Sequence, residues 1–248
     1  MKICVAQTKP VTGNVVINIL NHIRLIDLAI SHNSDIIIFP ELSLTGYEPG
    51  LAKALAIVED DPRLDIFQKM SDTHRIIIGI GAPIKKSIGI SISMVVFQPY
   101  TNRQLYSKKY IHADEVPFFI SGTDTMIISM PEIKIALAIC YEISVQQHVE
   151  NAMKEGAGIY IASVAKFENG IAKAISRLSD IARNHSMTVL MSNATGLADG
   201  DICAGKSSVW DKTGKLKAQL DNTAEGILVM DTVTGNITKS VLITGPES

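Results

Sequence analysis

Three side chains with complementary chemistry each stand at the end of a short apolar run. Cys140 ends residues 133–140, Glu41 follows residues 35–40, and Lys108 ends residues 104–108. Short apolar runs predict buried strands, and open α/β folds usually place their sites at the carboxyl ends of strands. A carboxylate, an ammonium and a thiol at three strand ends indicate hydrolysis by a thiol nucleophile.

The three groups suit the steps of such a reaction. A thiol attacks a carbonyl or nitrile carbon as the thiolate, so it needs a base or a cation beside it. Glu41 can accept the proton, and Lys108 can stabilise first the thiolate and then the oxyanion of a tetrahedral intermediate. The backbone N–H of Tyr141 follows the nucleophile directly and is a natural second oxyanion donor.

Three segments carry a resemblance to a known family. The segments Phe39-Pro40-Glu41-Leu42, Tyr106-x-Lys108-x-x-Ile111 and Ile139-Cys140-Tyr141-Glu142 resemble, in order and spacing, the signatures of the nitrilase superfamily, the carbon–nitrogen hydrolases. The resemblance extends from residues 3–7 to residues 205–209 and 225–228. It implies that Glu41 is the general base, Lys108 the electrostatic support and Cys140 the nucleophile that forms a thioester.

The same resemblance suggests further site residues and a substrate class. It implies that Glu115, on the loop after Lys108, lines the site, although Asp114 is adjacent. We expect Lys166, on the loop after a strand, to contact substrate, with a solvated lysine as the alternative. A small amide or N-carbamoyl substrate is favoured over a nitrile, and no metal or organic cofactor is implied.

One position departs from the family pattern. Many members carry an arginine two residues after the acid at Glu142, but this chain has Ser144 there. Glu142 is interpreted as a structural acid, which leaves its charge partner open. Arg177 and Arg183 are the two candidates.

Several other interpretations compete with the hydrolase. A lone cysteine in an apolar strand is usually a small core residue, which is our interpretation of Cys4, and Cys203 is expected in a polar loop. Catalysis by a Cys–His pair would use His112 or His148, but no matching Asn or Asp pattern accompanies them. A phosphatase loop needs an arginine that Val145-Gln146-Gln147 does not supply. A catalytically silent binding or regulatory subunit and an amide-forming acyltransferase also stay open.

Composition excludes several classes of protein. The chain has 248 residues and a formal charge of -2, with no basic stretch to bind nucleic acid. No apolar run reaches the ~20 residues of a membrane helix, and the N-terminal apolar run is too short for a signal peptide. Three scattered cysteines argue against a disulfide framework and favour the cytoplasm, and no His/Cys cluster suggests structural zinc.

The pattern of apolar residues alternates strands with helices. Strands are predicted at residues 2–7, 35–39, 75–80, 88–98, 103–107, 125–129, 133–140, 158–163 and 188–193, before a terminal β-meander at 207–210, 216–220 and 227–233. Helices are predicted around the apolar residues Val16, Ile19, Leu20, Ile23, Ile26 and Ile30 with Asn14 as N-cap, around Leu64, Phe67, Met70 and Ser71, and over 145–155 and 171–185.

This order of elements predicts an α/β fold, and the resemblance makes it a four-layer α-β-β-α sandwich of two mixed sheets with helices on both outer faces. We expect one domain over residues 1–235, followed by a tail over 236–248 that contributes to a dimer contact. A homodimer or higher homo-oligomer is expected, because family members commonly pair and two-fold dimers are the commonest assembly.

Overall fold

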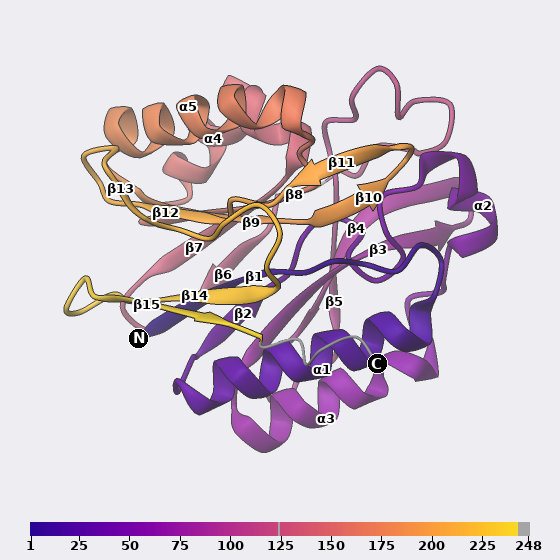
Figure 1. Ribbon diagram of the computed structural model, residues 1–248, viewed down its shortest axis with the longest axis horizontal. Coiled ribbons are helices and arrows are strands. Elements are labelled where there is room, and N and C mark those ends of the chain that lie inside the picture. Colours follow the sequence, from indigo (N-terminus) through magenta and orange to yellow (C-terminus); the bar gives the residue numbers. More distant parts are fainter. Residues whose placement is uncertain (124, 243–248) are drawn as a thin grey trace.

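Two mixed β-sheets stack face to face, and helices cover the outer face of each (Figure 1). The structure is a computed structural model that describes residues 1–123 and 125–242. The layers follow the order helix, sheet, sheet, helix, so the predicted four-layer sandwich is confirmed.

The two sheets differ in size, but in each of them the central strands are parallel. The seven-stranded sheet has the spatial order β15 (Ile237–Val241), β14 (Gly226–Asp231), β1 (Lys2–Gln7), β2 (Ile36–Ile38), β3 (Ile77–Lys86), β4 (Gly89–Phe97) and β5 (Gln104–Ser107). The six-stranded sheet has the order β13 (Leu216–Gln219), β12 (Ser208–Trp210), β9 (Thr188–Asn193), β8 (Ile159–Val164), β7 (Lys134–Ile139) and β6 (Ile127–Ser129). A separate hairpin joins β10 (Thr195–Ala198) to β11 (Asp201–Ala204).

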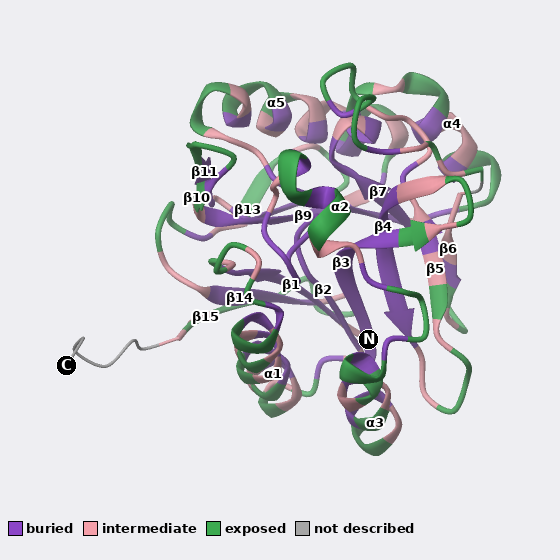
Figure 2. Ribbon diagram, turned by 90° about the vertical axis from the view of Figure 1, so that its right-hand side faces the viewer, coloured by how far each residue is buried: buried purple, intermediate pink, exposed green. Residues whose placement is uncertain are grey.

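Helices α1 (Val15–Ser31) and α3 (Asp65–His74) lie on the seven-stranded sheet, and α4 (Gln146–Lys154) and α5 (Glu168–His185) lie on the six-stranded one (Figure 1). Short helical turns complete the chain: η1 (Pro49–Leu51), α2 (Ala52–Leu55), η2 (Pro62–Leu64) and η3 (Cys140–Ser144). The sheets are buried and the helices expose their outer sides (Figure 2). In the part of the chain that the structure describes, no helix is both long and apolar enough to cross a membrane.

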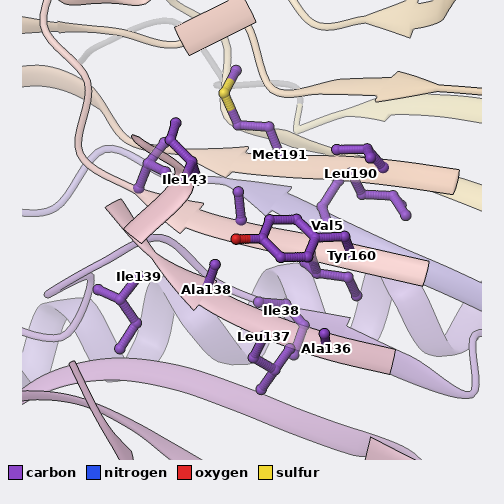
Figure 3. Packing of buried hydrophobic residues seen from close by; sticks show 14 of the residues in the cluster. Val5, Ile38, Ala136, Leu137, Ala138, Ile139, Ile143, Tyr160, Leu190 and Met191 are labelled. Carbon is purple, nitrogen blue, oxygen red and sulfur yellow. The ribbon is translucent and has the colours of Figure 1, made fainter. Parts of the chain in front are cut away.

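The strands are buried on both faces because alternate side chains enter different cores. In β2, Ile36 and Ile38 join the core between the sheets, whereas Ile37 joins the core under α1 and α3. Figure 3 shows Val5 and Ile38 of one sheet facing residues of the other, such as Tyr160 and Leu190. Two serines also tie the sheets together: Ser163 Oγ donates to the Phe39 carbonyl at 2.8 Å, and Ser192 Oγ donates to the Ala6 carbonyl at 2.6 Å.

The N-cap of α1 is confirmed, and four of the six apolar residues that predicted the helix pack against the core: Ile19, Ile23, Ile26 and Ile30. Asn14 accepts from the Ile17 N–H as the cap. The other two, Val16 and Leu20, are 62% and 56% exposed. The buried residues are Val15, Asn18, His22, Leu25, Ile26 and Ala29.

Two polar residues enter that face because their hydrogen bonds are satisfied there. Asn18 Nδ2 donates to the carbonyls of Val11 and Leu44, each at 2.9 Å. His22 lies 2.6 Å from the Asn18 carbonyl and 2.9 Å from Ser43 Oγ.

The predicted terminal meander is also wrong, because its last strand changes sheet. β12 and β13 form a hairpin in the six-stranded sheet, but β14 pairs with β1 and β15 in the seven-stranded sheet. Residues 237–241, expected in the tail, form β15, while residues 243–248 lie outside the described residues. The domain boundary, the dimer and the role of the tail remain predictions.

Candidate active site

The three predicted residues stand just beyond strands of the two sheets. Glu41 follows β2 and Lys108 follows β5, in the seven-stranded sheet. Cys140 follows β7 of the six-stranded sheet and opens η3, rather than ending the strand as the sequence suggested. The face-to-face packing of the sheets brings the three strand ends together.

Lys108 is the centre of a buried charge cluster. Its side chain is fully buried, and Nζ donates to Glu41 Oε1 at 2.8 Å and to Glu115 Oε1 and Oε2 at 2.7 and 2.8 Å. Burial alone would lower the pKa of Lys108, but Glu41 and then Cys140 and Glu115 raise it well above its ordinary value. The amine is therefore charged at neutral pH.

One of the two carboxylate oxygens of Glu41 accepts no hydrogen bond from the described residues. Oε1 accepts from Lys108, whereas Oε2 is buried and has no hydrogen-bond partner among residues 1–123 and 125–242. Burial raises the pKa of Glu41, Lys108 lowers it, Glu115 raises it, and the net shift is upward. A carboxylate with a free oxygen and a raised pKa is well suited to accept and return a proton.

Glu115 comes from the loop after β5 and closes the cluster. Beyond its two bonds from Lys108, it accepts from Tyr47 Oη at 3.0 Å and from the His112 N–H at 2.9 Å. Its neighbour Asp114 is exposed and pairs with the His112 ring instead. Of the two adjacent acids, Glu115 therefore belongs to the cluster and Asp114 does not.

Cys140 adopts a backbone conformation that is rare for a residue with a side chain. Its φ is +43°, in the left-handed region, and such strain is concentrated at functional sites. The sharp turn after β7 presents the thiol to a cavity of about 570 Å³. Burial raises the pKa of the Cys140 thiol and Glu41 raises it further, whereas Lys166 and then Lys108 lower it.

The cavity wall contains two more of the predicted residues. Tyr141 lines it with its ring 4.9 Å from that of His112, and Lys166 lines it from the loop after β8. Asn193, on β9, holds the Lys166 peptide on both sides: its Oδ1 accepts from the Lys166 N–H at 2.8 Å, and its Nδ2 donates to the Lys166 carbonyl at 3.2 Å. Glu41 and Lys108 are buried and are not among the residues that line the cavity.

Residues 2–239 match the family described as carbon-nitrogen hydrolase. The chain belongs to the carbon-nitrogen hydrolase family. The match spans both sheets and all three motifs, so the resemblance to the carbon–nitrogen hydrolases is confirmed.

Solved amidases share the fold of this carbon-nitrogen hydrolase. A variant of the amidase from Nesterenkonia sp. AN1 in complex with butyramide aligns with a TM-score of 0.84 at 18% identity, over 92% of this chain and 89% of that one. Another structure of an amidase from Nesterenkonia sp. gives 0.84 at 19% identity with the same coverage. At these identities the likeness establishes the fold alone.

The curated relatives are larger proteins. A glutamine-dependent NAD(+) synthetase of Thermotoga maritima is 23% identical over 87% of this chain but only 39% of its own length. One of Aquifex aeolicus is 25% identical over 98% of this chain and 44% of its own length. The chain therefore spans about two-fifths of the length of these relatives.

Glu142, whose charge partner the sequence left open, is satisfied by hydrogen bonds. Glu142 is fully buried; its Oε1 accepts from the Lys109 N–H at 2.7 Å, and its Oε2 accepts from the Ile139 N–H at 2.7 Å and from Tyr106 Oη at 2.5 Å. His148 Nε2 lies 3.6 Å from the same oxygen.

Neither predicted arginine fills the place of that partner. The Arg177 Nε donates to the Ile143 carbonyl, and Arg183 pairs with Asp180. Tyr106 lies on β5, 36 residues before Glu142, and His148 lies on α4, and the local pattern does not predict that either would meet Glu142.

Two glycines that sequence reasoning missed let the backbone approach the site closely. A Cβ on Gly81 of β3 would lie 2.3 Å from the Pro40 carbonyl oxygen and 2.5 Å from the Leu42 nitrogen. A Cβ on Gly122 would lie 2.1 Å from the Ser107 carbonyl oxygen. Both contacts are far below van der Waals distance, so the absent side chains fix where Glu41 and Lys108 stand.

The histidines do not form a Cys–His pair. Both ring nitrogens of His148 are engaged, at 3.0 Å from Tyr106 Oη and 2.9 Å from Tyr160 Oη. His112 is exposed and pairs with Asp114. Cys203 is fully buried in β11 rather than in a polar loop. Within the described residues, no group of three or more His, Cys, Asp or Glu side chains is placed to hold a metal ion.

Proposed function

We propose that this protein hydrolyses a small amide through a thioester on Cys140. One observation carries the proposal: a cysteine on a strained turn lines the cavity, and close enough to act on its charge a buried lysine is paired with a glutamate that keeps one oxygen free. This arrangement supplies a nucleophile, a cation and a base at one point.

In the acylation step, Cys140 Sγ attacks the amide carbon and its proton passes to Glu41. The carbonyl oxygen becomes an oxyanion, which Lys108 and the Tyr141 N–H stabilise. Donors of this kind typically contribute about 2.7–4 kcal/mol each. The C–N bond then breaks, Glu41 gives its proton to the leaving amine, and a thioester remains.

In the deacylation step, Glu41 takes a proton from water, and the resulting hydroxide attacks the thioester carbon. The C–S bond breaks, the acid leaves, and Glu41 returns the proton to the sulfur. The free Oε2 suits both steps, because one carboxylate must act alternately as base and acid.

A second candidate follows from the curated relatives. Glutamine is an amide, and the relatives named as glutamine-dependent synthetases match this chain along 87–98% of its length. We therefore propose glutamine as a substrate to be tested, with the released ammonia used by a synthetase. An acyltransferase would keep the same thioester and pass the acyl group to an amine.

The test measures ammonia release from small amides, glutamine, N-carbamoyl amines and nitriles by the protein and by Cys140→Ala. Release that requires Cys140 is the expected result, and the best substrate names the class. Hydroxamate formation with hydroxylamine traps the thioester. No release from any compound, with no Cys140-dependent labelling by iodoacetamide, would favour the silent-subunit reading.

A further inference from the structure

The net charge of the ionised groups close to Cys140 opposes formation of the thiolate. When Lys108, Glu41 and Glu115 are all ionised, the cluster that these three residues form carries one net negative charge, because a single ammonium contacts two carboxylates. A negative cluster beside a buried thiol opposes its ionisation. Burial and Glu41 accordingly raise the pKa of Cys140.

Lys166 adds a positive charge that offsets this negative charge. It lines the same cavity as Cys140, and the charge of Cys140 is the largest influence on the pKa of the Lys166 ammonium. It lowers the pKa of the Cys140 thiol more than Lys108 does. Cys140 in turn raises the pKa of Lys166 above its ordinary value, so the amine is charged.

The backbone fixes Lys166 in this position. The two bonds from Asn193 hold its peptide, and its carbonyl also accepts from the Ala204 N–H of β11 at 2.8 Å. α5 begins two residues later, at Glu168. β8, which leads to Lys166, pairs with β7, which leads to Cys140, so the ammonium and the thiol come from adjacent parallel strands.

We propose that Lys166 is a second catalytic cation, which stabilises the Cys140 thiolate and is distinct from the oxyanion support of Lys108. The inference rests on the proposed function, since it adds a residue to the same reaction. Lys108 donates to two carboxylates, whereas Lys166 lines the cavity beside Cys140, which has the largest effect on the pKa of Lys166. The titratable groups that interact electrostatically with Cys140 are Glu41, Glu115, Lys108, Lys166, Tyr47 and Cys203.

The test is the pH dependence of Cys140 alkylation by iodoacetamide, an uncharged reagent. The thiolate displaces iodide to form an S–C bond, so the rate follows the ionised fraction. Cys140→Ala gives the background from Cys4 and Cys203. In Lys166→Met the midpoint should rise by about one to two pH units, the usual effect of an opposite charge nearby. Alkylation at pH 7 should then slow by about tenfold or more.

Matched variants separate charge from packing. Lys166→Arg keeps the charge and should restore the midpoint at least in part, while Lys166→Gln, the variant to use if Lys166→Met does not fold, should behave as Lys166→Met. Lys173→Met, an exposed lysine that lines the same cavity from α5, should leave the midpoint of alkylation where it is.

Three outcomes would overturn the inference. An unchanged midpoint in a folded Lys166→Met protein would do so while leaving the proposed function intact. A raised KM for a neutral amide, with alkylation unchanged, would make Lys166 a substrate contact instead. Wild-type protein whose Cys140 is not alkylated at any pH would remove the proposed function and this inference together.

Discussion

Two buried glutamates close to the site, Glu41 and Glu142, have opposite surroundings. Glu41 shares one oxygen with an ammonium and leaves the other without a hydrogen bond. Glu142 has both oxygens occupied, by two backbone N–H groups and a tyrosine hydroxyl at 2.7 Å or less. One carboxylate is prepared to exchange a proton and the other is fixed in place.

The difference shows what each carboxylate is for. A fully hydrogen-bonded carboxylate holds other parts of the chain, and Glu142 joins Lys109, next to Lys108, to Ile139, next to Cys140. A carboxylate with a free buried oxygen carries a cost in stability that only a functional role repays. Glu142 therefore sets the distance between the two strand ends, and Glu41 works between them.

The comparison predicts the largest effect at Glu41. Glu41→Gln removes the base but keeps the shape of the side chain, and Glu115 still pairs with Lys108. Ammonia release should fall by roughly 10²–10⁴-fold, the usual contribution of general acid–base catalysis. The melting temperature should stay the same or rise, because the removed charge was incompletely satisfied. A variant that keeps full activity would contradict the assignment.

Glu142→Gln should show the reverse pattern. An amide nitrogen would face N–H donors, so the variant loses charge-assisted hydrogen bonds and should unfold about 3 kcal/mol more easily in urea. Activity should fall less than in Glu41→Gln. The exposed Glu132→Gln is the control and should leave both properties unchanged. If Glu142→Gln were as stable as Glu132→Gln, Glu142 would have no structural role.

A smaller and mixed effect is expected from Gly81→Ala, which disturbs Glu41 without changing it. The new Cβ would collide with the Pro40 carbonyl oxygen and the Leu42 nitrogen. Overpacking of this kind costs about 1–3 kcal/mol, and a displaced catalytic group loses up to about 100-fold in rate. Gly50→Ala is the matched control, because nothing lies within 4 Å of its Cβ. Comparable activity in the two variants would show that the Glu41 segment tolerates displacement.

The sequence predicted the strand ends but not what surrounds them. Glu41, Lys108 and Cys140 could be placed because apolar runs mark strands and strand ends meet at one edge of a sheet. The network around Glu142 could not, because Tyr106 comes from the other sheet, 36 residues earlier, and meets Glu142, His148 and Tyr160 only through packing. The close approach at Gly81 leaves no trace in local composition either.

Two residues of the α1 pattern and the path of β14 were predicted wrongly for related reasons. The spacing of apolar residues favoured Val16 and Leu20, but buried hydrogen bonds selected Asn18 and His22 for the inner face. β14 resembled the third strand of a meander, yet its pairing with β1 joins opposite ends of the chain. Burial of satisfied polar groups and pairing over long distances are outside the reach of a local pattern.

The effect that is smallest at neutral pH concerns His22, which supports the segment after Glu41 through Ser43. Burial lowers the pKa of His22 from 6.5 to about 4, against a weaker opposing effect of the Asn18 carbonyl. Between these values the unfolded chain binds a proton that the folded protein does not, so stability is complete above pH 6.5 and falls as the pH drops.

Each pH unit in that window should remove about 1.4 kcal/mol of unfolding free energy, and the loss should level off near the folded pKa. Urea denaturation between pH 7 and 4 measures this slope in the protein and in His22→Asn, which cannot titrate. Carboxylates contribute equally to both curves, so their difference isolates His22. Parallel curves would mean that His22 takes up its proton as readily in the folded protein as in the unfolded chain.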